Sequence, residues 1–352
     1  MQIISLGGNK EDNYYQLGLK DRTSSNEIFH LTSSLTKTTN SFTRNLKNIS
    51  SSLIFKKNFS NYSLVKAYAE GLGKPESEVI SIFLTPDLIS SMNSFTSNFP
   101  SIQFGCSSLF FKNEENNLSH LRILDFPLGD SYTKNERFIK YSFKGEQKYC
   151  GFSTSGFPFP AITGMNESGL TFALHQKFGH IFNKNGTPIF DIMENLISQA
   201  RDIKDILSEI KKIKSISTWG IHIGSIKEHS VLSIDLLGEK YNFENTELNE
   251  GTLYFNNTFL NKNIDIDFHQ PLNFNNFCEE RQNDAKKRIK SFKSKTSEEI
   301  LKNFTSLTSE TNQALVITPS SLLSCVMEPD KSSICYNSGL GPRTFQHPKQ
   351  KI

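Results

Sequence analysis

The sequence has few of the features that mark nucleic-acid-binding, membrane-spanning or secreted proteins. Its 39 basic and 36 acidic residues give a net charge of only +3 and are spread along the chain, whereas nucleic-acid-binding proteins usually gather basic residues on one face. No run approaches the ~18 consecutive apolar residues of a membrane-spanning helix. Residues 1–10 lack the basic segment and long apolar run of a secretory signal. We therefore expect no nucleic-acid partner, no membrane span and no secretory signal.

Cysteines are few, odd in number and far apart. The five lie at positions 106, 150, 278, 325 and 335, with no Cys-x-x-Cys pair, which argues against a disulfide framework or a zinc knuckle. None of the eight histidines forms a His-x3-His pair, so no metal or other cofactor is expected. The four cysteines after Cys106 are expected to be small core residues. Free thiols fit a reducing, cytoplasmic location.

The pattern of the chain changes after about residue 100. The first part reads as a strand at residues 1–6 followed mostly by helices, at 11–20, 62–70, 76–83 and, beyond Pro86, 89–95. Strands dominate the rest, with helices between them, which predicts a layered mixture of α and β structure. The expected strands are 102–104, 138–143, 170–174, 219–223, 231–236, 252–256, 314–318, 322–327 and 333–336, and the expected helices are 192–213, 277–292 and 297–307.

Cys106 lies in the most informative stretch of the chain. An apolar strand carries it, a polar turn follows at residues 112–117, and a second strand returns Arg122 and Asp125 towards the thiol. A neighbouring guanidinium favours the thiolate, which is the nucleophilic form of cysteine. The aspartate could fix the arginine or accept a hydrogen bond from an amine beside the sulfur. Taken alone, the pattern also fits an ordinary hairpin with a buried cysteine.

Further segments accompany this hairpin in a fixed order. They are Ile-Thr-Gly-Met-Asn-Glu-Ser-Gly-Leu at 162–170, Phe-Asn-Asn-Thr-Phe at 255–259, Glu-Glu-Arg at 279–281, and the closing segments 323–329 and 339–342. Together they resemble the cysteine branch of the N-terminal-nucleophile (Ntn) hydrolases. That branch holds the choloylglycine (bile-salt) hydrolases, the acid-ceramidase-like amidases and the acyl-coenzyme A:6-aminopenicillanic acid acyltransferases. An early Leu-Gly-Gly at 6–8 with Tyr-Gln-Leu-Gly at 15–18 resembles the entry motif of the acyltransferases.

The resemblance implies a fold and a division of the chain. The fold is the α+β Ntn sandwich of four layers, αββα, with two antiparallel sheets between helix layers, preceded by a mostly helical N-terminal region. Residues 1–105 would form a pro-region or α-subunit-like segment, and residues 106–352 the catalytic domain. A homo-oligomer of the whole chain is one option that the sequence leaves open.

The resemblance also implies that the chain is cut between Gly105 and Cys106. The new N-terminal amine has a reference pKa of about 7.7–8.0, so one residue would supply both nucleophile and general base. A glycine at 105 would ease the strained geometry of self-cleavage, although a strand-end glycine explains it equally well. An acyl group would pass from a small-molecule amide or acyl thioester to the thiol, and then to water or to an amine. The long region before the cysteine favours the acyltransferase-like branch.

The remaining site residues follow from the same resemblance. Either Asn256 or Asn257 is expected to offer its NH2 group to the oxyanion, and Gln176 stands where bile-salt hydrolases have an asparagine. Arg281 lies where the family has a later arginine, although it could be an exposed arginine of a charged helix. The catalytic set expected from the resemblance is Cys106, Arg122, Asp125, Gln176, Asn256, Asn257 and Arg281.

Some positions depart from the family pattern. The family usually has Gly-Arg-Asn-x-Asp, whereas Leu121 and Ile123 flank the arginine here. The alternative function is therefore a non-catalytic, uncleaved Ntn-fold protein that binds an acyl ligand. Asn166 is favoured as a turn residue, and His120 and His175 as packed or hydrogen-bonded side chains.

Overall fold

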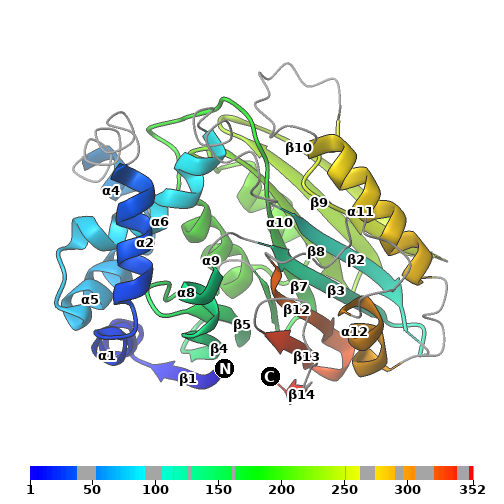
Figure 1. The fold of residues 1–352 in the computed structure, drawn as a ribbon, viewed down its shortest axis with the longest axis horizontal. Coiled ribbons are helices and arrows are strands. Elements are labelled where there is room, and N and C mark those ends of the chain that lie inside the picture. Colours follow the sequence, from blue (N-terminus) through cyan, green and yellow to red (C-terminus); the bar gives the residue numbers. More distant parts are fainter. Residues whose placement is uncertain are drawn as a thin grey trace.

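A computed structural model gives the fold of the chain (Figure 1). It contains two β-sheets, with helices on their outer faces and at one end of the larger sheet. The residues that the structure describes are 1–37, 53–91, 105–113, 115–125, 129–160, 163–249, 251–261, 274–289, 296–305, 321–338 and 349–351. The strands expected at 102–104 and 314–318 lie outside them, as do residues 339–342.

The larger sheet has eight strands in the order β1-β4-β5-β6-β7-β8-β9-β10. Neighbouring strands are antiparallel except β1 and β4, which are parallel. Their bounds are β1 Gln2–Gly8, β4 Glu136–Phe143, β5 Tyr149–Thr154, β6 Thr163–Asn166, β7 Leu170–Gln176, β8 Thr218–Ser225, β9 Ser230–Leu237 and β10 Lys240–Glu247.

The smaller sheet has six antiparallel strands and carries the predicted hairpin. Its order is β11-β2-β3-β12-β13-β14, and β2 and β3 are joined by the polar turn expected from the sequence. Residues of β3 and β12 are buried on both faces, so this sheet is covered on both sides. The bounds are β2 Cys106–Lys112, β3 Leu118–Asp125, β11 Thr252–Phe255, β12 Ser321–Glu328, β13 Ser333–Ser338 and β14 Lys349–Lys351.

The sheets and helices stack in four layers. The two sheets face each other, with β2 against β7 and β3 against β8. Helices α11 (Phe274–Ile289) and α12 (Ser297–Thr305) pack their apolar residues on the outer face of the six-stranded sheet. Helices α9 (Ile189–Gln199) and α10 (Ile203–Ile210) do the same for the eight-stranded sheet. The predicted αββα arrangement is therefore confirmed, with parallel β1 as the exception to its antiparallel sheets.

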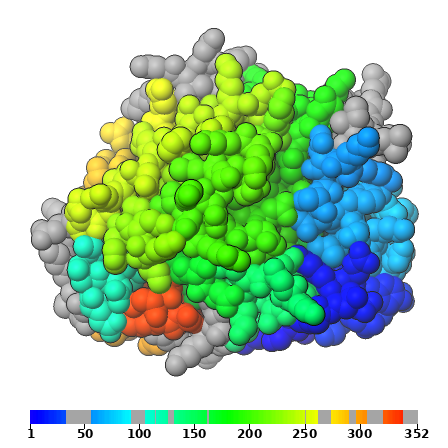
Figure 2. All heavy atoms as spheres, turned by 180° about the vertical axis from the view of Figure 1, so that it is seen from behind, coloured from blue at the N-terminus to red at the C-terminus, as the bar shows by residue number. Residues whose placement is uncertain are grey.

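The N-terminal helices pack at one end of the eight-stranded sheet, beside residues of the middle of the chain (Figures 1 and 2). Two of them approach very closely, because a Cβ on Gly18 would lie 2.3 Å from the Tyr68 carbonyl oxygen. The buried carboxylate of Asp21 binds Arg137 of β4 at 2.6 Å and accepts from the Tyr68 hydroxyl. The helices are α1 Lys10–Asp21, α2 Asn26–Lys37, α4 Leu53–Asn58, α5 Tyr62–Leu72 and α6 Glu76–Ser91, and a short α8 (Gly129–Thr133) follows β3.

The helix break expected near Pro86 is wrong, because α6 runs through that residue. A proline inside a helix costs about 3 kcal/mol. Burial offsets this cost, since all ten residues from 82 to 91 are buried. Asp87, which directly follows Pro86, is also held from outside the helix, because its carboxylate accepts hydrogen bonds from Ser217 and Trp219 at 2.7 Å.

The single helix expected at 192–213 is also wrong, because the structure has α9 and α10 there. Ala200 leaves the helical conformation with ψ of 133°. Asp202 then caps α10, and its side chain accepts from the Asp205 N–H at 2.9 Å. An aspartate at this position favours a new helix start. The sequence analysis missed the break because the apolar periodicity of a helix continues on both sides of the Asp202 cap.

The cysteines match the expectation for core residues. Cys150, Cys278, Cys325 and Cys335 are buried free thiols, and so is Cys106. Of the helices that the structure describes, none is long and apolar enough to cross a membrane. Within the same residues, no group of His, Cys, Asp or Glu side chains could hold a metal ion.

Candidate active site

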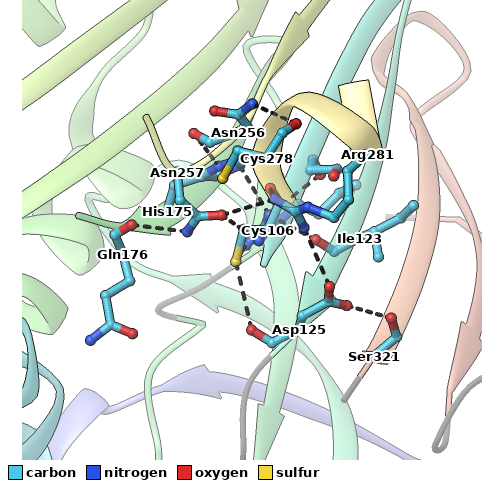
Figure 3. A network of polar contacts seen from close by, with 12 residues as sticks. Cys106, Ile123, Asp125, His175, Gln176, Asn256, Asn257, Cys278, Arg281 and Ser321 are labelled. Carbon is cyan, nitrogen blue, oxygen red and sulfur yellow. Dashed lines mark hydrogen bonds and ion pairs between the residues drawn. The ribbon is translucent and has the colours of Figure 1, made fainter. Parts of the chain in front are cut away.

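Cys106 is the first residue of β2, at the end of the hairpin where β3 finishes (Figure 3). The strand register pairs Cys106 with Leu124, next to Asp125. Its thiol lies 4.0 Å from the Asp125 carbonyl oxygen and is almost fully buried. The local pairing of two strands therefore brings the predicted nucleophile and the end of β3 together.

Arg122 lies directly behind the thiol. Its Nη2 donates to the Cys106 sulfur at 3.1 Å and to the Leu174 carbonyl oxygen at 2.6 Å. The guanidinium is fully buried, and no carboxylate of the described residues lies within ion-pair distance of it. A buried charge is costly without an opposite charge. A thiolate at Cys106 would supply that charge, so Arg122 is suited to stabilise negative charge on the sulfur.

Asn257 binds the backbone nitrogen of Cys106. The Cys106 N–H donates to the Asn257 Oδ1 at 2.7 Å, and the Asn257 NH2 donates to the Gln176 carbonyl oxygen at 2.9 Å. Asn256 does not bind Cys106, because its NH2 donates to the Cys278 carbonyl oxygen at 3.4 Å and its Oδ1 accepts from the Thr258 N–H. It is thus an oxygen, not an NH2 group, that faces the cysteine nitrogen. The oxyanion role of either asparagine stays a prediction.

Arg281 of α11 is part of the site and not an exposed residue. It is fully buried, and its Nη2 donates to the Cys106 carbonyl oxygen at 3.1 Å and to the Asn257 Oδ1 at 3.2 Å. Its Nη1 pairs with the Asp125 carboxylate at 3.4 Å. The other oxygen of that carboxylate accepts from the Ser321 hydroxyl. Asp125 thus fixes Arg281 and not Arg122, which was the arginine expected from the sequence to be its partner.

Gly105 is also explained by Arg281. A Cβ at this position would lie 2.1 Å from the Arg281 Nη1 and 3.0 Å from an Asp125 carboxylate oxygen. Real side chains essentially never approach so closely, so only glycine fits here while the buried ion pair stays in place. The close approach of a side chain, more than a strand-end preference, accounts for this residue.

Gln176 is brought near the site by its backbone but not by its side chain. Its carboxamide NH2 donates to the Ser90 hydroxyl of α6 at 3.1 Å. In Figure 3 the side chain points away from Cys106. The Oε1 atom has no hydrogen-bond partner within the described residues although it is buried. Among the expected site residues, the side chains of Gln176 and Asn256 are the two that make no hydrogen bond or ion pair with Cys106, Arg122 or Arg281.

Sequence reasoning did not assign a site role to His175, Lys177 or Asp235. Burial lowers the pKa of His175 well below its usual range, and the nearby Arg122 lowers that pKa further. Lys177 and Asp235 form a fully buried ion pair at 3.3 Å, and the Lys177 ammonium also donates to the Asn256 and Thr258 carbonyl oxygens. The only sequence signal for His175 and Lys177 was their place on either side of Gln176, and Asp235 lies far from it in the sequence.

Asn166 and His120 have structural roles, as expected. The Asn166 NH2 donates to the carbonyl oxygens of Ile197 and Ala200, and its Oδ1 accepts from the Leu170 N–H. His120 is buried, stacks on Phe110 and shares a hydrogen bond with Thr171.

No family model and no curated protein matches the sequence. One similar solved structure is the N-acylethanolamine-hydrolyzing acid amidase ortholog of Caenorhabditis elegans, with a TM-score of 0.47 and 13% identity, covering 64% of this chain and 93% of that chain.

Two bacterial enzymes are similar to a comparable degree. Penicillin V acylase from Agrobacterium tumefaciens has a TM-score of 0.45 and 11% identity, covering 70% of this chain and 86% of that chain. A mutant of conjugated bile acid hydrolase from Clostridium perfringens has a TM-score of 0.45 and 14% identity, covering 70% and 92%. All three are members of the Ntn-hydrolase superfamily, which the sequence motifs resemble.

Proposed function

We propose that the chain is a self-processing cysteine amidohydrolase or acyltransferase of the Ntn type. It would act on a non-peptide amide bond through an acyl thioester on Cys106. The observation that carries this proposal is the contact of 3.1 Å between Arg122 Nη2 and the Cys106 sulfur. A buried guanidinium with no carboxylate partner among the described residues favours a negatively charged sulfur.

Processing would begin with attack of the Cys106 thiol on the Gly105 carbonyl carbon. A carbon–sulfur bond forms, the carbon–nitrogen bond of the peptide breaks, and the thiol proton passes to the leaving nitrogen. Water then opens the thioester, which leaves a carboxylate on Gly105 and restores the thiol beside a free α-amine. The bond of 2.7 Å to Asn257 Oδ1 supports this route, because it holds the nitrogen that must leave.

Turnover would use the same atoms in the cleaved protein. The α-amine accepts the thiol proton, the sulfur attacks the amide carbonyl of the substrate, and the protonated amine returns the proton to the leaving nitrogen. Arg281 keeps the Cys106 backbone fixed through its carbonyl oxygen, and Asp125 keeps Arg281 in place. Water or an amine then takes the acyl group from the sulfur.

The names of the similar structures support an amide as substrate. They include an amidase that hydrolyses N-acylethanolamines, a penicillin acylase and a conjugated bile acid hydrolase. A small-molecule amide or a related acyl thioester is therefore the substrate class that we propose for this chain.

Intact-mass measurement and denaturing electrophoresis of the purified full chain test the proposal. We expect two fragments in place of the 39.9 kDa chain and one acyl group added to the fragment that begins with Cys106 after treatment with an electrophilic acyl probe. Cys106→Ala should abolish both cleavage and labelling. Cys278→Ala is the matched control, because it removes another buried thiol near the site and should retain both.

The same measurement separates the alternative function. A single uncut band, with no acyl group on Cys106, would favour a protein that only binds an acyl ligand. The departures at Leu121 and Ile123, and the side chain of Gln176 bound to Ser90, are the features that fit this alternative. Cleavage of Cys106→Ala between residues 105 and 106 would overturn the self-processing route.

A further inference from the structure

We propose that His175 is a positioning residue, which holds the Arg122 guanidinium against the Cys106 sulfur and ties it to the loop that binds the Cys106 nitrogen. The role of the thiol rests on the proposed function. The contacts of the ring do not, and they can be measured separately.

The partners of the ring fix its tautomer. His175 Nδ1 lies 3.1 Å from the Asn256 carbonyl oxygen, which can only accept a hydrogen bond. His175 Nε2 lies 3.0 Å from Arg122 Nη1, which can only donate one. Both neighbours therefore require a neutral ring with the proton on Nδ1 and a lone pair on Nε2. The Ser108 hydroxyl, 2.8 Å from Nε2, can donate to the same lone pair.

The acceptor at Nε2 matters for the orientation of Arg122. The guanidinium also donates through Nη1 to the Ile123 carbonyl oxygen at 2.9 Å and through Nη2 to the Leu174 carbonyl oxygen at 2.6 Å. These bonds fix the plane in which the second Nη2 hydrogen reaches the Cys106 sulfur. Without His175 Nε2, a buried N–H of Arg122 would lose its short acceptor, and the side chain would gain freedom to turn from the sulfur.

The donor at Nδ1 matters for the nitrogen side of the site. Its acceptor, Asn256, directly precedes Asn257, whose Oδ1 accepts from the Cys106 N–H at 2.7 Å. One ring thus connects the group that faces the sulfur of Cys106 with the loop that holds its nitrogen. The two contacts come from different elements, β3 and the segment after β11.

The surroundings keep the ring neutral. The charged or titratable groups that face His175 are Arg122 of β3, Lys177 directly after β7, and His222 of β8, whose ring packs edge-on at 4.4 Å. Full burial lowers the pKa of His175, and both cations lower it further. A second proton on the ring would also place an N–H against the Arg122 guanidinium. Nε2 therefore remains an acceptor over the pH range in which the protein would act.

Nitrogen NMR of the full-length protein, labelled with 15N-histidine, tests the tautomer without any substitution in the site. The His175 signals are assigned from their absence in His175→Gln. We expect a ring protonated on Nδ1 only, unchanged between about pH 6 and pH 8. A ring protonated on Nε2, or on both nitrogens, would overturn the proposal, whether or not the protein hydrolyses an amide.

The alkylation rate of Cys106 tests the consequence. It is measured with iodoacetamide at pH 7 by mass spectrometry of the peptide that carries Cys106, beside a thermal melt. We expect His175→Leu to lower the rate about tenfold or more, since small displacements in a site can change rates 100-fold. His175→Gln supplies an amide oxygen near the place of Nε2 and should restore much of the rate.

His120→Leu is the matched control. It also removes a buried imidazole, but His120 binds Thr171 and Phe110 and has no described hydrogen bond to Arg122 or Cys106. Its alkylation rate should equal that of the wild type. A folded His175→Leu with the wild-type rate would overturn the positioning role. If that variant does not fold, His175→Gln and the tautomer measurement decide.

Discussion

The guanidinium of Arg281 lies against Gly105, so that a Cβ at position 105 would be 2.1 Å from Nη1. The same guanidinium binds the Asp125 carboxylate and the Cys106 carbonyl oxygen. The peptide bond proposed to be cut is therefore packed against a buried ion pair.

Gly105→Ala should slow cleavage between residues 105 and 106 and lower stability by about 1–3 kcal/mol, the usual cost of forcing extra atoms into a packed site. Cleavage is followed by electrophoresis over time and stability by thermal melts. Gly105→Ala in an Arg281→Ala background is the control. There the added methyl group should cost much less stability, because the atom it meets is gone. Equal costs in the two backgrounds would show that Arg281 does not explain the glycine.

Arg122 and Asp125 can be tested by substitutions that change one property at a time. Arg122→Lys keeps a positive charge but not the planar fork of donors, and Asp125→Asn removes the charge that pairs with Arg281. Each should lower the acylation rate of Cys106 about 100-fold or more, because the groups that surround the sulfur and backbone would shift. The rate is measured by mass spectrometry with an acyl probe. A variant that fails to melt cooperatively would instead assign that residue a structural role.

The sequence was sufficient for the parts of the site that are local. Cys106, Arg122 and Asp125 lie on one hairpin, where an apolar run, a polar turn and a second apolar run determine which residues meet. The roles of His175 and Lys177 could not be predicted in this way. Their partners, Arg122 and Asp235, lie far away in the sequence, and only the packing of the two sheets brings them together.

The same distinction explains the errors in the helices. Pro86 is a local signal for a break, but the burial of residues 82–91 of α6 outweighs it. The end of α9 and the cap at Asp202 are local too, yet apolar periodicity continues across them. The sequence predicts strand β1 correctly. Its parallel pairing with β4 was not predicted, because it joins segments that are more than a hundred residues apart.

After cleavage, residues 1–105 should stay bound to the rest of the protein. Strand β1 belongs to the eight-stranded sheet, and Asp21 forms a buried ion pair with Arg137. Breaking such a pair leaves an uncompensated charge and costs about 3–5 kcal/mol. Size-exclusion chromatography of cleaved protein should therefore show one complex, which Arg137→Ala weakens. Lys134→Ala is the control, because its ion pair with Glu27 is exposed and worth about 0–1 kcal/mol. Separation of the wild-type fragments would contradict this prediction.

Glu136 should make stability fall as the pH rises. Burial raises the pKa of this carboxyl from 4.5 to about 8. The folded state thus binds a proton that the unfolded chain has lost, so the stabilisation is full below about pH 4.5 and is lost as the pH rises towards 8. Glu136→Gln should remove this loss. The melting temperature of this variant should therefore rise relative to that of the wild type as the pH goes from 5 to 8. Exposed Glu11→Gln is the control and should show no such gain. Parallel pH profiles for Glu136→Gln and the wild type would contradict the prediction.

The acyl group on Cys106 should have more than one acceptor. The region before the cysteine resembles the acyltransferase branch, so an acyl thioester on Cys106 should react with a small amine as well as with water. With an accepted amide or thioester substrate, an added amine should divert product from free acid to new amide in proportion to its concentration. Chromatography with mass detection measures both products, and Cys106→Ala should form neither. An unchanged yield of free acid with every amine tried would show a plain hydrolase. Cys106 would remain the nucleophile in that case, because the thioester forms before the acceptor is chosen.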